Sequence, residues 1–113
     1  MKAILIDVKE KVVKEVEYSH WTEVRELLNC DFFTAVSLNE KGDAIYVDDE
    51  GLLTLTPESM FFSIEGNPQY LAGNGLVVGI EENGESEEPN VTLEEIQEKV
   101  RFHTLDEVKN YIF

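Results

Sequence analysis

The pattern of hydrophobic and polar residues near the N-terminus predicts two strands and a helix. Lys2–Val8 has apolar residues on both faces, which is typical of a strand in the middle of a sheet. Val12–Tyr18 is a second predicted strand, and the two segments together indicate a hairpin. Ser19 is the predicted N-cap of a helix over His20–Leu28, in which apolar residues including Trp21 recur at helical spacing on one face.

The middle of the chain predicts a run of short strands separated by turns. Phe32–Leu38 and Ala44–Asp48 are rich in β-branched and aromatic residues and are expected to form a second hairpin. Met60–Ile64 and Gly75–Glu81 are expected to be further strands, the second of them in the core. Leu52–Leu55 is interpreted as an additional extended segment.

The C-terminal part combines an acidic segment with two helix starts. Residues 82–90 contain acids, Gly, Ser and Pro but nothing apolar to bury, which predicts a mobile acidic loop. The capping boxes Thr92–Glu95 and Thr104–Glu107 each predict the start of a short helix. Val100 is expected on the apolar face of the first of these helices with Leu93 and Ile96, or else Val100–His103 forms a short strand with Phe102 turned inward.

The order of these elements indicates the fold class. A β-β-α start, a run of strands and short final helices are typical of an α+β domain with a mostly antiparallel sheet. A chain of 113 residues suits one domain, so residues 1–113 are predicted to form a single domain. The hydrophobic fraction of 42% is that of a folded chain rather than a disordered one.

Negative charge dominates the composition and is unevenly distributed. The chain carries 24 acidic and 9 basic residues, a net charge of −15. Residues 1–30 are nearly balanced at −1, whereas residues 31–80 and 81–113 each carry −7. Because nucleic acids and anionic membranes are recognised largely by Lys and Arg, direct binding to either is disfavoured. The excess acids either keep the protein in solution or attract a partner with a basic surface.

No combination of residues in the sequence predicts catalysis, a metal centre or a bound cofactor. Cys30 is the single cysteine, and neither His20 nor His103 forms a known nucleophile signature with it. These residues are also too few for a zinc site. No apolar run has the length of a membrane span or a signal peptide, so the sequence predicts a cytoplasmic, non-enzymatic protein.

The acidic turn that ends in Gly51 is the clearest local candidate for contact with a partner. It is open to three interpretations: a solvated hairpin turn, a site for a hard cation, or a contact surface for a basic partner. Adjacent carboxylates point in different directions, which disfavours the cation. The predicted interaction surface comprises Tyr46, Asp48, Asp49, Glu50 and Asn74.

The glycine-rich segment Gly73–Gly79 invites comparison with a dinucleotide-binding fingerprint. That fingerprint requires Gly or Ala where Val78 stands, and a helix where this segment predicts a strand. A tight turn that enters a strand is the better interpretation. In an alternative function, the Gly73–Gly75 turn and nearby aromatic residues form the mouth of a small-ligand pocket.

Two pairs of adjacent phenylalanines, Phe32-Phe33 and Phe61-Phe62, each place one ring on either side of a predicted strand. Some of these rings must therefore leave the main core. Either a helix covers the second face of the sheet, or the rings form an exposed aromatic surface that binds a protein.

Three segments are similar, in order and spacing, to those of a known family: Ile45–Leu52, Ala72–Gly79 and Val100–Leu105. The family resembled is one of small uncharacterised domains, a domain of unknown function found in phages, plasmids and bacteria. The resemblance covers about residues 40–113. It implies a phage or mobile-element accessory protein, and it carries no catalytic or binding residue with it.

These observations favour a non-enzymatic acidic binding protein that engages a basic surface of a host protein. One version is nucleic-acid mimicry, in which surface carboxylates occupy a cleft that normally binds DNA. The alternative is a small-ligand-binding domain, although basic residues that would hold a nucleotide are nearly absent around the Gly73–Gly75 turn.

Overall fold

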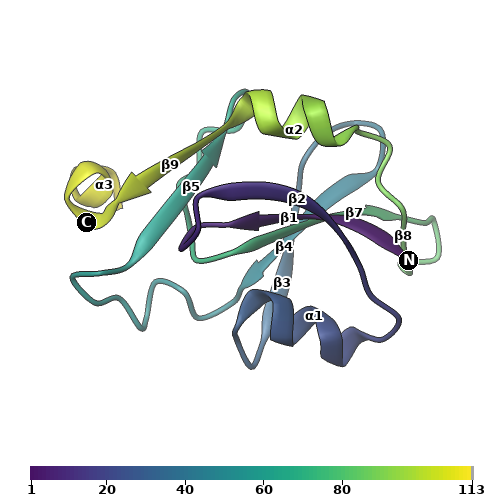
Figure 1. Ribbon diagram of the computed structural model, residues 1–113, viewed down its shortest axis with the longest axis horizontal. Coiled ribbons are helices and arrows are strands. Elements are labelled where there is room, and N and C mark those ends of the chain that lie inside the picture. Colours follow the sequence, from purple (N-terminus) through teal and green to yellow (C-terminus); the bar gives the residue numbers. More distant parts are fainter. Residues whose placement is uncertain (113) are drawn as a thin grey trace.

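A computed structural model describes residues 1–112, which form two antiparallel sheets and three helices (Figure 1). The larger sheet contains β1 (Lys2–Asp7), β2 (Val12–Glu17), β3 (Phe33–Ser37), β4 (Asp43–Asp48), β7 (Gly75–Ile80) and β8 (Ser86–Glu87). The smaller sheet contains β5 (Met60–Ile64), β6 (Leu71–Ala72) and β9 (Val100–Thr104). The helices are α1 (Trp21–Leu28), α2 (Leu93–Lys99) and α3 (Leu105–Ile112). The predicted α+β class is confirmed, and Phe113 lies outside the described residues.

The larger sheet has the strand order β2-β1-β7-β4-β3, with β8 paired to β7. Both predicted hairpins are confirmed, because β1 pairs with β2 and β3 pairs with β4, each antiparallel. β1 lies between two neighbours, as its two apolar faces predicted. The order also leaves β2 and β3 as the two outer strands of the sheet.

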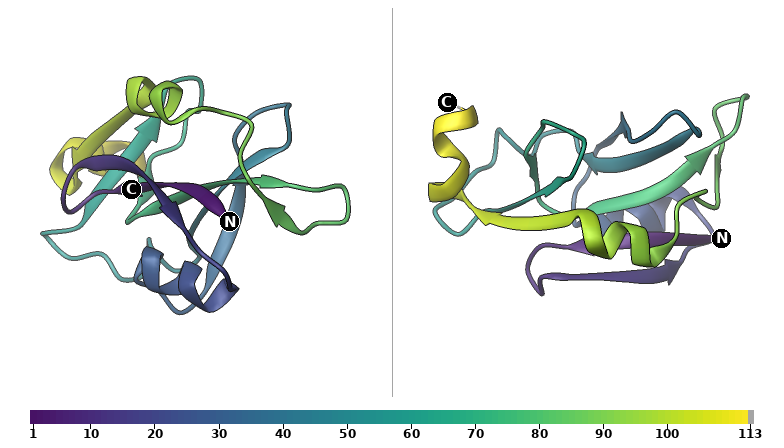
Figure 2. Two further views of the ribbon diagram at one scale, coloured as in Figure 1. Left: turned by 45° about the vertical axis from the view of Figure 1, so that its right-hand side comes forward. Right: turned by 90° about the horizontal axis from the view of Figure 1, so that it is seen from above.

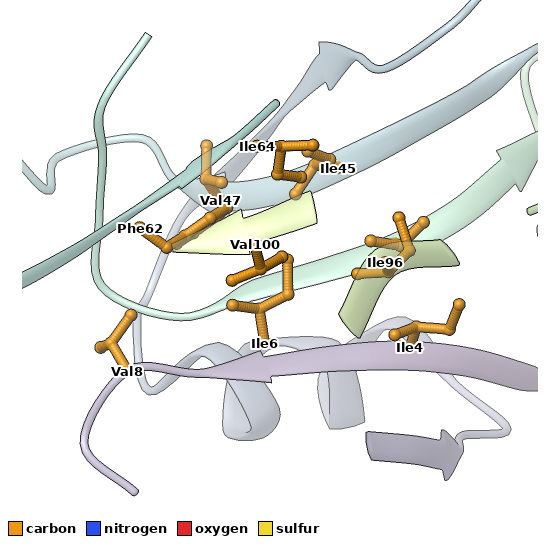
Figure 3. Close-up of a cluster of buried hydrophobic side chains, with 10 residues drawn as sticks. Ile4, Ile6, Val8, Ile45, Val47, Phe62, Ile64, Ile96 and Val100 are labelled. Atoms are coloured by element: carbon orange, nitrogen blue, oxygen red, sulfur yellow. The ribbon is translucent and has the colours of Figure 1, made fainter. Parts of the chain in front are cut away.

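The two faces of the larger sheet support two separate layers of core. Along β1, alternate residues point to opposite faces, so Ile4 and Ile6 enter one cluster while Ala3 and Leu5 enter the other. α1 covers the Leu5 face, and the smaller sheet with α2 covers the Ile6 face (Figures 1 and 2). Figure 3 shows the cluster on the Ile6 face, in which Phe62 lies among the aliphatic side chains of β1 and β4.

A side chain caps the start of each helix, and one of the three N-caps differs from the sequence prediction. Thr104 and Glu107 form a reciprocal capping box, because Glu107 Oε1 accepts from the Thr104 N–H at 3.0 Å and Thr104 Oγ1 from the Glu107 N–H at 3.4 Å. The Thr92 side chain caps α2. The N-cap of α1 is His20 and not Ser19, because the His20 ring accepts a hydrogen bond from the Thr22 N–H at 3.2 Å.

The start of α1 also differs from the sequence prediction in the position of Trp21. The helical spacing predicts Trp21 on the apolar face of the helix, yet the residue is 54% exposed. Trp21 is the first residue of the helix, and its ring lies 5.0 Å from the Arg25 guanidinium on the outer side. Val24 and Leu28 are the residues of α1 that are buried against the sheet.

Between the predicted strands the structure differs in three places. Leu52–Leu55 forms turns instead of a strand, because the Leu53 N–H bonds the Glu50 carbonyl at 2.9 Å and closes the chain on itself. The two-residue strands β6 and β8 were missed, and β8 lies inside the predicted acidic loop 82–90. The mobility of that loop stays a prediction. Val100–Thr104 is a strand, which decides between the two interpretations of this segment.

Within residues 1–112 one carboxylate is buried, and it connects two distant segments. Asp43, at the start of β4, is 2% exposed. Its side chain accepts hydrogen bonds from the Asn39 amide at 2.9 Å and the Val91 N–H at 3.2 Å. It also accepts from the backbone and side-chain nitrogens of Asn90, at 2.8 and 3.1 Å. Asp43 therefore holds the approach to α2 against the β3–β4 turn.

Candidate functional site

The three predicted carboxylates lie together in the turn after β4. Asp48 is the last residue of the strand, and its Oδ1 accepts the Glu50 N–H at 2.9 Å, which orders the turn. The side chains of Asp49 and Glu50 are exposed. Among residues 1–112, no three His, Cys, Asp or Glu side chains are grouped so that they could hold a metal ion.

An exposed aromatic ring lies beside this turn. The Asp49 N–H bonds the Phe32 carbonyl at 3.0 Å, so Phe32 and Asp49 face each other at the end of the β3–β4 ladder. Phe32 is 63% exposed, and Asp31 precedes it in the chain. We call this group the acidic corner: Asp31, Phe32, Asp48, Asp49 and Glu50.

The two phenylalanine pairs thus have different surroundings. Phe61 and Phe62 are both fully buried. Phe62 packs in the core cluster on the Ile6 face, and α3 contacts β5 and covers its second face, as one of the two alternatives predicted. Phe33 is half-buried under the α1 layer, whereas Phe32 points into solvent. The sequence singled out both pairs but did not show which ring is exposed.

Tyr46, also predicted for the surface, lies on β4 two residues before Asp48 and is half-buried. Its ring centroid is 4.9 Å from that of Phe33, within the α1 layer. Burial raises the pKa of the Tyr46 phenol, an effect that Ser86 partly offsets and Tyr18 increases. The phenol therefore stays protonated at neutral pH and contributes mainly to packing.

Asn74 has its hydrogen-bonding partners inside the molecule. Its Oδ1 accepts the Val8 N–H at 3.0 Å, and its Nδ2 donates to the Leu27 carbonyl at 3.1 Å. Asn74 therefore ties the turn before β7 to the end of β1 and to the last turn of α1. This role is structural, and the acidic corner does not include the residue.

The glycine-rich segment is a turn that enters a strand, as predicted. Gly73 has a left-handed φ of 78°, and β7 begins at Gly75. Gly73 lines a hollow of about 140 Å³ that also touches Asp48. No aromatic residue lines this hollow, so the predicted aromatic pocket mouth does not form there.

Cys30 lies between α1 and the acidic corner, and its thiol is unreactive at neutral pH. Burial first, and then the negative charges of Asp48 and Asp31, raise the pKa of its thiol to about 11, against a smaller opposing effect of Arg25. The thiol is therefore protonated at neutral pH and is a poor nucleophile. His20 and His103 have other partners, since His20 caps α1 and His103 Nε2 lies 2.8 Å from Ser63 Oγ.

This environment predicts slow alkylation of Cys30 in the folded protein. At pH 8 a pKa of about 11 in place of 9.0 leaves about 100-fold less thiolate than in the unfolded chain. The alkylation rate should keep rising with pH beyond the range in which an ordinary thiol levels off. Asp48→Asn should move this profile to lower pH, and Asp106→Asn, at a distant site on α3, should leave it in place. Iodoacetamide kinetics against pH measure both, and equal rates in the folded and unfolded chains would contradict the prediction.

The strand that leads away from the acidic corner is an open edge. β3 is the last strand of the larger sheet, and in the described part of the chain it pairs only with β4. Its sequence, Phe33–Ser37, contains no charged residue and no proline. Natural sheet edges are usually protected by charges, prolines, bulges or a covering segment, and β3 has no such side chain.

The hydrogen-bond pattern shows which backbone groups of β3 point outward. Asp49 N–H bonds Phe32 O, and Leu38 N–H bonds Asp43 O. In an antiparallel pair only every second residue is hydrogen-bonded to the neighbouring strand, so these two bonds identify the residues of β3 that bond to β4. Phe33, Ala35 and Ser37 therefore direct their N–H and C=O groups away from the sheet.

The opposite edge of the same sheet is protected. β2 carries Lys14, Glu15 and Glu17, and its outer side lies next to α2. The side-chain amide of Gln97 on α2 donates to the Val13 carbonyl at 3.0 Å. The edge at β3 was missed from the sequence, although an uncharged run in such an acidic region is a signal that could have indicated it.

Comparison with known proteins adds a family and no activity. A family model described as a domain of unknown function, DUF3846, matches residues 1–101. The match includes the first 40 residues, which the resemblance seen in the sequence left out. No curated protein and no solved structure matches the chain significantly. Within the described residues, no helix is both long and apolar enough to cross a membrane. Because the family model covers most of its length, the chain belongs to the DUF3846 family of domains of unknown function.

Proposed function

We propose that this protein is a non-enzymatic binding protein that takes up an extended, basic segment of a partner protein along β3. The observation that carries the proposal is the continuity of an uncharged open edge strand with the acidic corner. An added strand gains main-chain hydrogen bonds from the edge, and its charged side chains select the partner. The resemblance to phage and plasmid domains favours a host protein as that partner.

The charge of the surface supports a basic partner. Two ion pairs form among residues 1–112, Lys2 with Glu15 and Lys109 with Asp106, and both are exposed. The carboxylates of the acidic corner take part in neither. Uncompensated charge of one sign attracts a partner of the opposite sign and speeds association, and salt weakens this effect.

The exposed ring of Phe32 supplies the apolar part of such a contact. Protein interfaces typically combine a few buried aromatic residues with a polar rim. Phe32 stands at the end of the open strand, and Asp31 and Asp49 are next to it. A partner strand that pairs with β3 would pass this ring and place its basic residues near both carboxylates.

A peptide titration tests the proposal. A short peptide that alternates Lys and Val is added to isotope-labelled protein, and the backbone amide signals are followed by NMR. We expect the largest shifts and new protection from hydrogen exchange at Phe33, Ala35 and Ser37. Affinity should fall as salt increases, and a peptide with Glu in place of Lys should not bind.

Ala35→Pro is the decisive variant, with Ala35→Thr as its matched control. Proline removes an outward N–H and leaves the ladder with β4 intact, so it should weaken peptide binding about tenfold or more. Threonine keeps the N–H and suits a strand, so it should bind as the native protein does. Asp31→Asn combined with Asp49→Asn should reduce both the affinity and its salt dependence.

The outcomes separate strand addition from nucleic-acid mimicry. Salt-dependent binding that Ala35→Pro leaves unchanged would show that carboxylates alone attract the peptide, as mimicry requires, and would overturn strand addition. An absence of binding by the Lys peptide at low salt would remove both versions.

A further inference from the structure

The outer face of the smaller sheet is covered by α3 at one end only. Ser63 on β5 pairs with Arg101 on β9, and Phe61 pairs with His103, so all four side chains lie on this face. α3 contacts both strands, and its Val108 is buried, as Phe61 is. The Ser63 end stays open and contains a hollow of about 330 Å³.

The Ser63–Arg101 hollow is the part of the C-terminal surface where basic residues gather. Its lining includes Ser63, Glu65, Asn67, Tyr70, Lys99 and Arg101. After residue 81 the chain has three basic residues, and Lys99 and Arg101 are two of them. In residues 1–112, neither of these two side chains forms an ion pair. The hollow therefore differs in charge from the rest of a chain whose net charge is −15.

Hydrogen bonds fix the orientation of the Arg101 guanidinium. Its Nη1 donates to the Glu98 carbonyl at 2.8 Å and to the Val100 carbonyl at 2.9 Å, at the end of α2. These bonds use one of the three guanidinium nitrogens. Among the residues that the structure describes, Nε and Nη2 have no acceptor, and this pair of donors suits the two oxygens of a carboxylate or phosphate.

A hydroxyl group and an aromatic ring complete the hollow. Ser63 Oγ lies 2.8 Å from His103 Nε2, and which of the two donates depends on the His103 tautomer. In the tautomer that carries its proton on Nε2, the ring donates to Oγ and the hydroxyl proton of Ser63 is available to a ligand. The ring of Tyr70 lies edge-on to that of His103, with 5.0 Å between the ring centroids, and its centroid is 5.3 Å from that of Tyr111. Tyr70 is thus a preformed aromatic wall beside the basic residues.

We propose that the Ser63–Arg101 hollow binds a small oxyanion, a carboxylate or phosphate monoester carried on a planar ring. Arg101 and Lys99 hold the anionic oxygens, Ser63 donates a hydrogen bond to one of them, and Tyr70 contacts the ring. The volume lies at the lower end of small-molecule sites, which suits a ligand of this size. Glu65 on the rim repels the anion and limits its affinity. This site is separate from the acidic corner and does not depend on the proposed partner.

Titration with phenyl phosphate, benzoate and inorganic phosphate, followed by NMR, tests the site and distinguishes the two anions. The amide signals of Ser63, Tyr70 and Arg101 should shift, and phenyl phosphate should bind more tightly than inorganic phosphate because of Tyr70. Arg101→Gln should weaken binding of the aryl anion about tenfold. Lys109→Gln removes a cation of α3 that pairs with Asp106 outside the hollow, and it should leave binding unchanged.

Glu65→Gln makes the test independent of folding defects. Arg101 also caps the end of α2, so its variant could lose binding because the fold is disturbed. A gain of affinity, in contrast, cannot result from misfolding. Removal of the negative charge at Glu65 should tighten binding of phenyl phosphate about threefold. The proposal is overturned if neither aryl anion shifts these signals, or if Arg101→Gln and Lys109→Gln behave alike.

Discussion

Asp43→Ala should lower the free energy of unfolding by about 3 kcal/mol, because it leaves buried donors without an acceptor. The carboxylate accepts four hydrogen bonds, and two of them come from the backbone N–H groups of Asn90 and Val91. Those donors are 47 and 48 residues away in the chain, so the approach to α2 loses its attachment to the β3–β4 turn. Urea unfolding followed by circular dichroism measures the loss, which is a large share of the stability of a small domain.

Asp43→Asn and Asp49→Ala are the matched controls for this result. Asparagine keeps the shape but turns an N–H₂ group toward the same donors, so its loss should be smaller than that of alanine and still measurable. Asp49 is exposed and its side chain has no comparable partners, so Asp49→Ala should change stability by less than about 0.5 kcal/mol. Equal stability of Asp43→Ala and Asp49→Ala would show that the buried hydrogen bonds do not stabilise the fold.

Gly75→Ala should lower the free energy of unfolding by about 2 kcal/mol through overpacking. A Cβ at this position would lie 2.5 Å from Phe62 Cζ and 3.0 Å from Ile45 Cγ2. Both neighbours are fully buried in the core cluster of Figure 3, so neither side chain can move aside without disturbing others. Thermal and urea unfolding both report this change.

A second substitution tests whether Phe62 is the cause. Phe62→Leu removes the atoms closest to the new methyl group, so it should cost less in the Gly75→Ala background than in the native protein. Gly66→Ala is the control, because its Cβ would meet nothing within 4 Å and its cost comes only from the positive φ of 93°. Phe62→Leu should offset none of the loss in Gly66→Ala, and purely additive effects with Gly75→Ala would contradict the packing explanation.

The acidic corner illustrates how much of a site the sequence can indicate. Asp48, Asp49 and Glu50 are adjacent in the chain, and charged residues in a turn are mostly exposed, so the sequence alone groups these three. Phe32 and Asp31 join them only because β3 pairs with β4 in a particular register. The exposure of Phe32 and the partial burial of Phe33 depend on which face of the sheet α1 covers.

Asn74, which belongs to the interaction surface predicted from the sequence, shows what a sequence does not indicate about a turn residue. Its amide bonds Val8 and Leu27, which lie 66 and 47 residues away, and no local pattern encodes these partners. The same holds for the hollow at Ser63 and Arg101, since these two residues meet only across the β5–β9 ladder.

By itself, the sequence determined the α+β class, both hairpins, the capping boxes of the final helices and the acidic turn. Each of these depends on interactions between residues close in the chain, or on a periodicity that one face of an element imposes. Tertiary structure alone decided the strand order, the open edge at β3, the buried role of Asp43 and the basic hollow on the smaller sheet. These features depend on contacts between distant segments, in which the burial of one side chain is set by whichever element covers it.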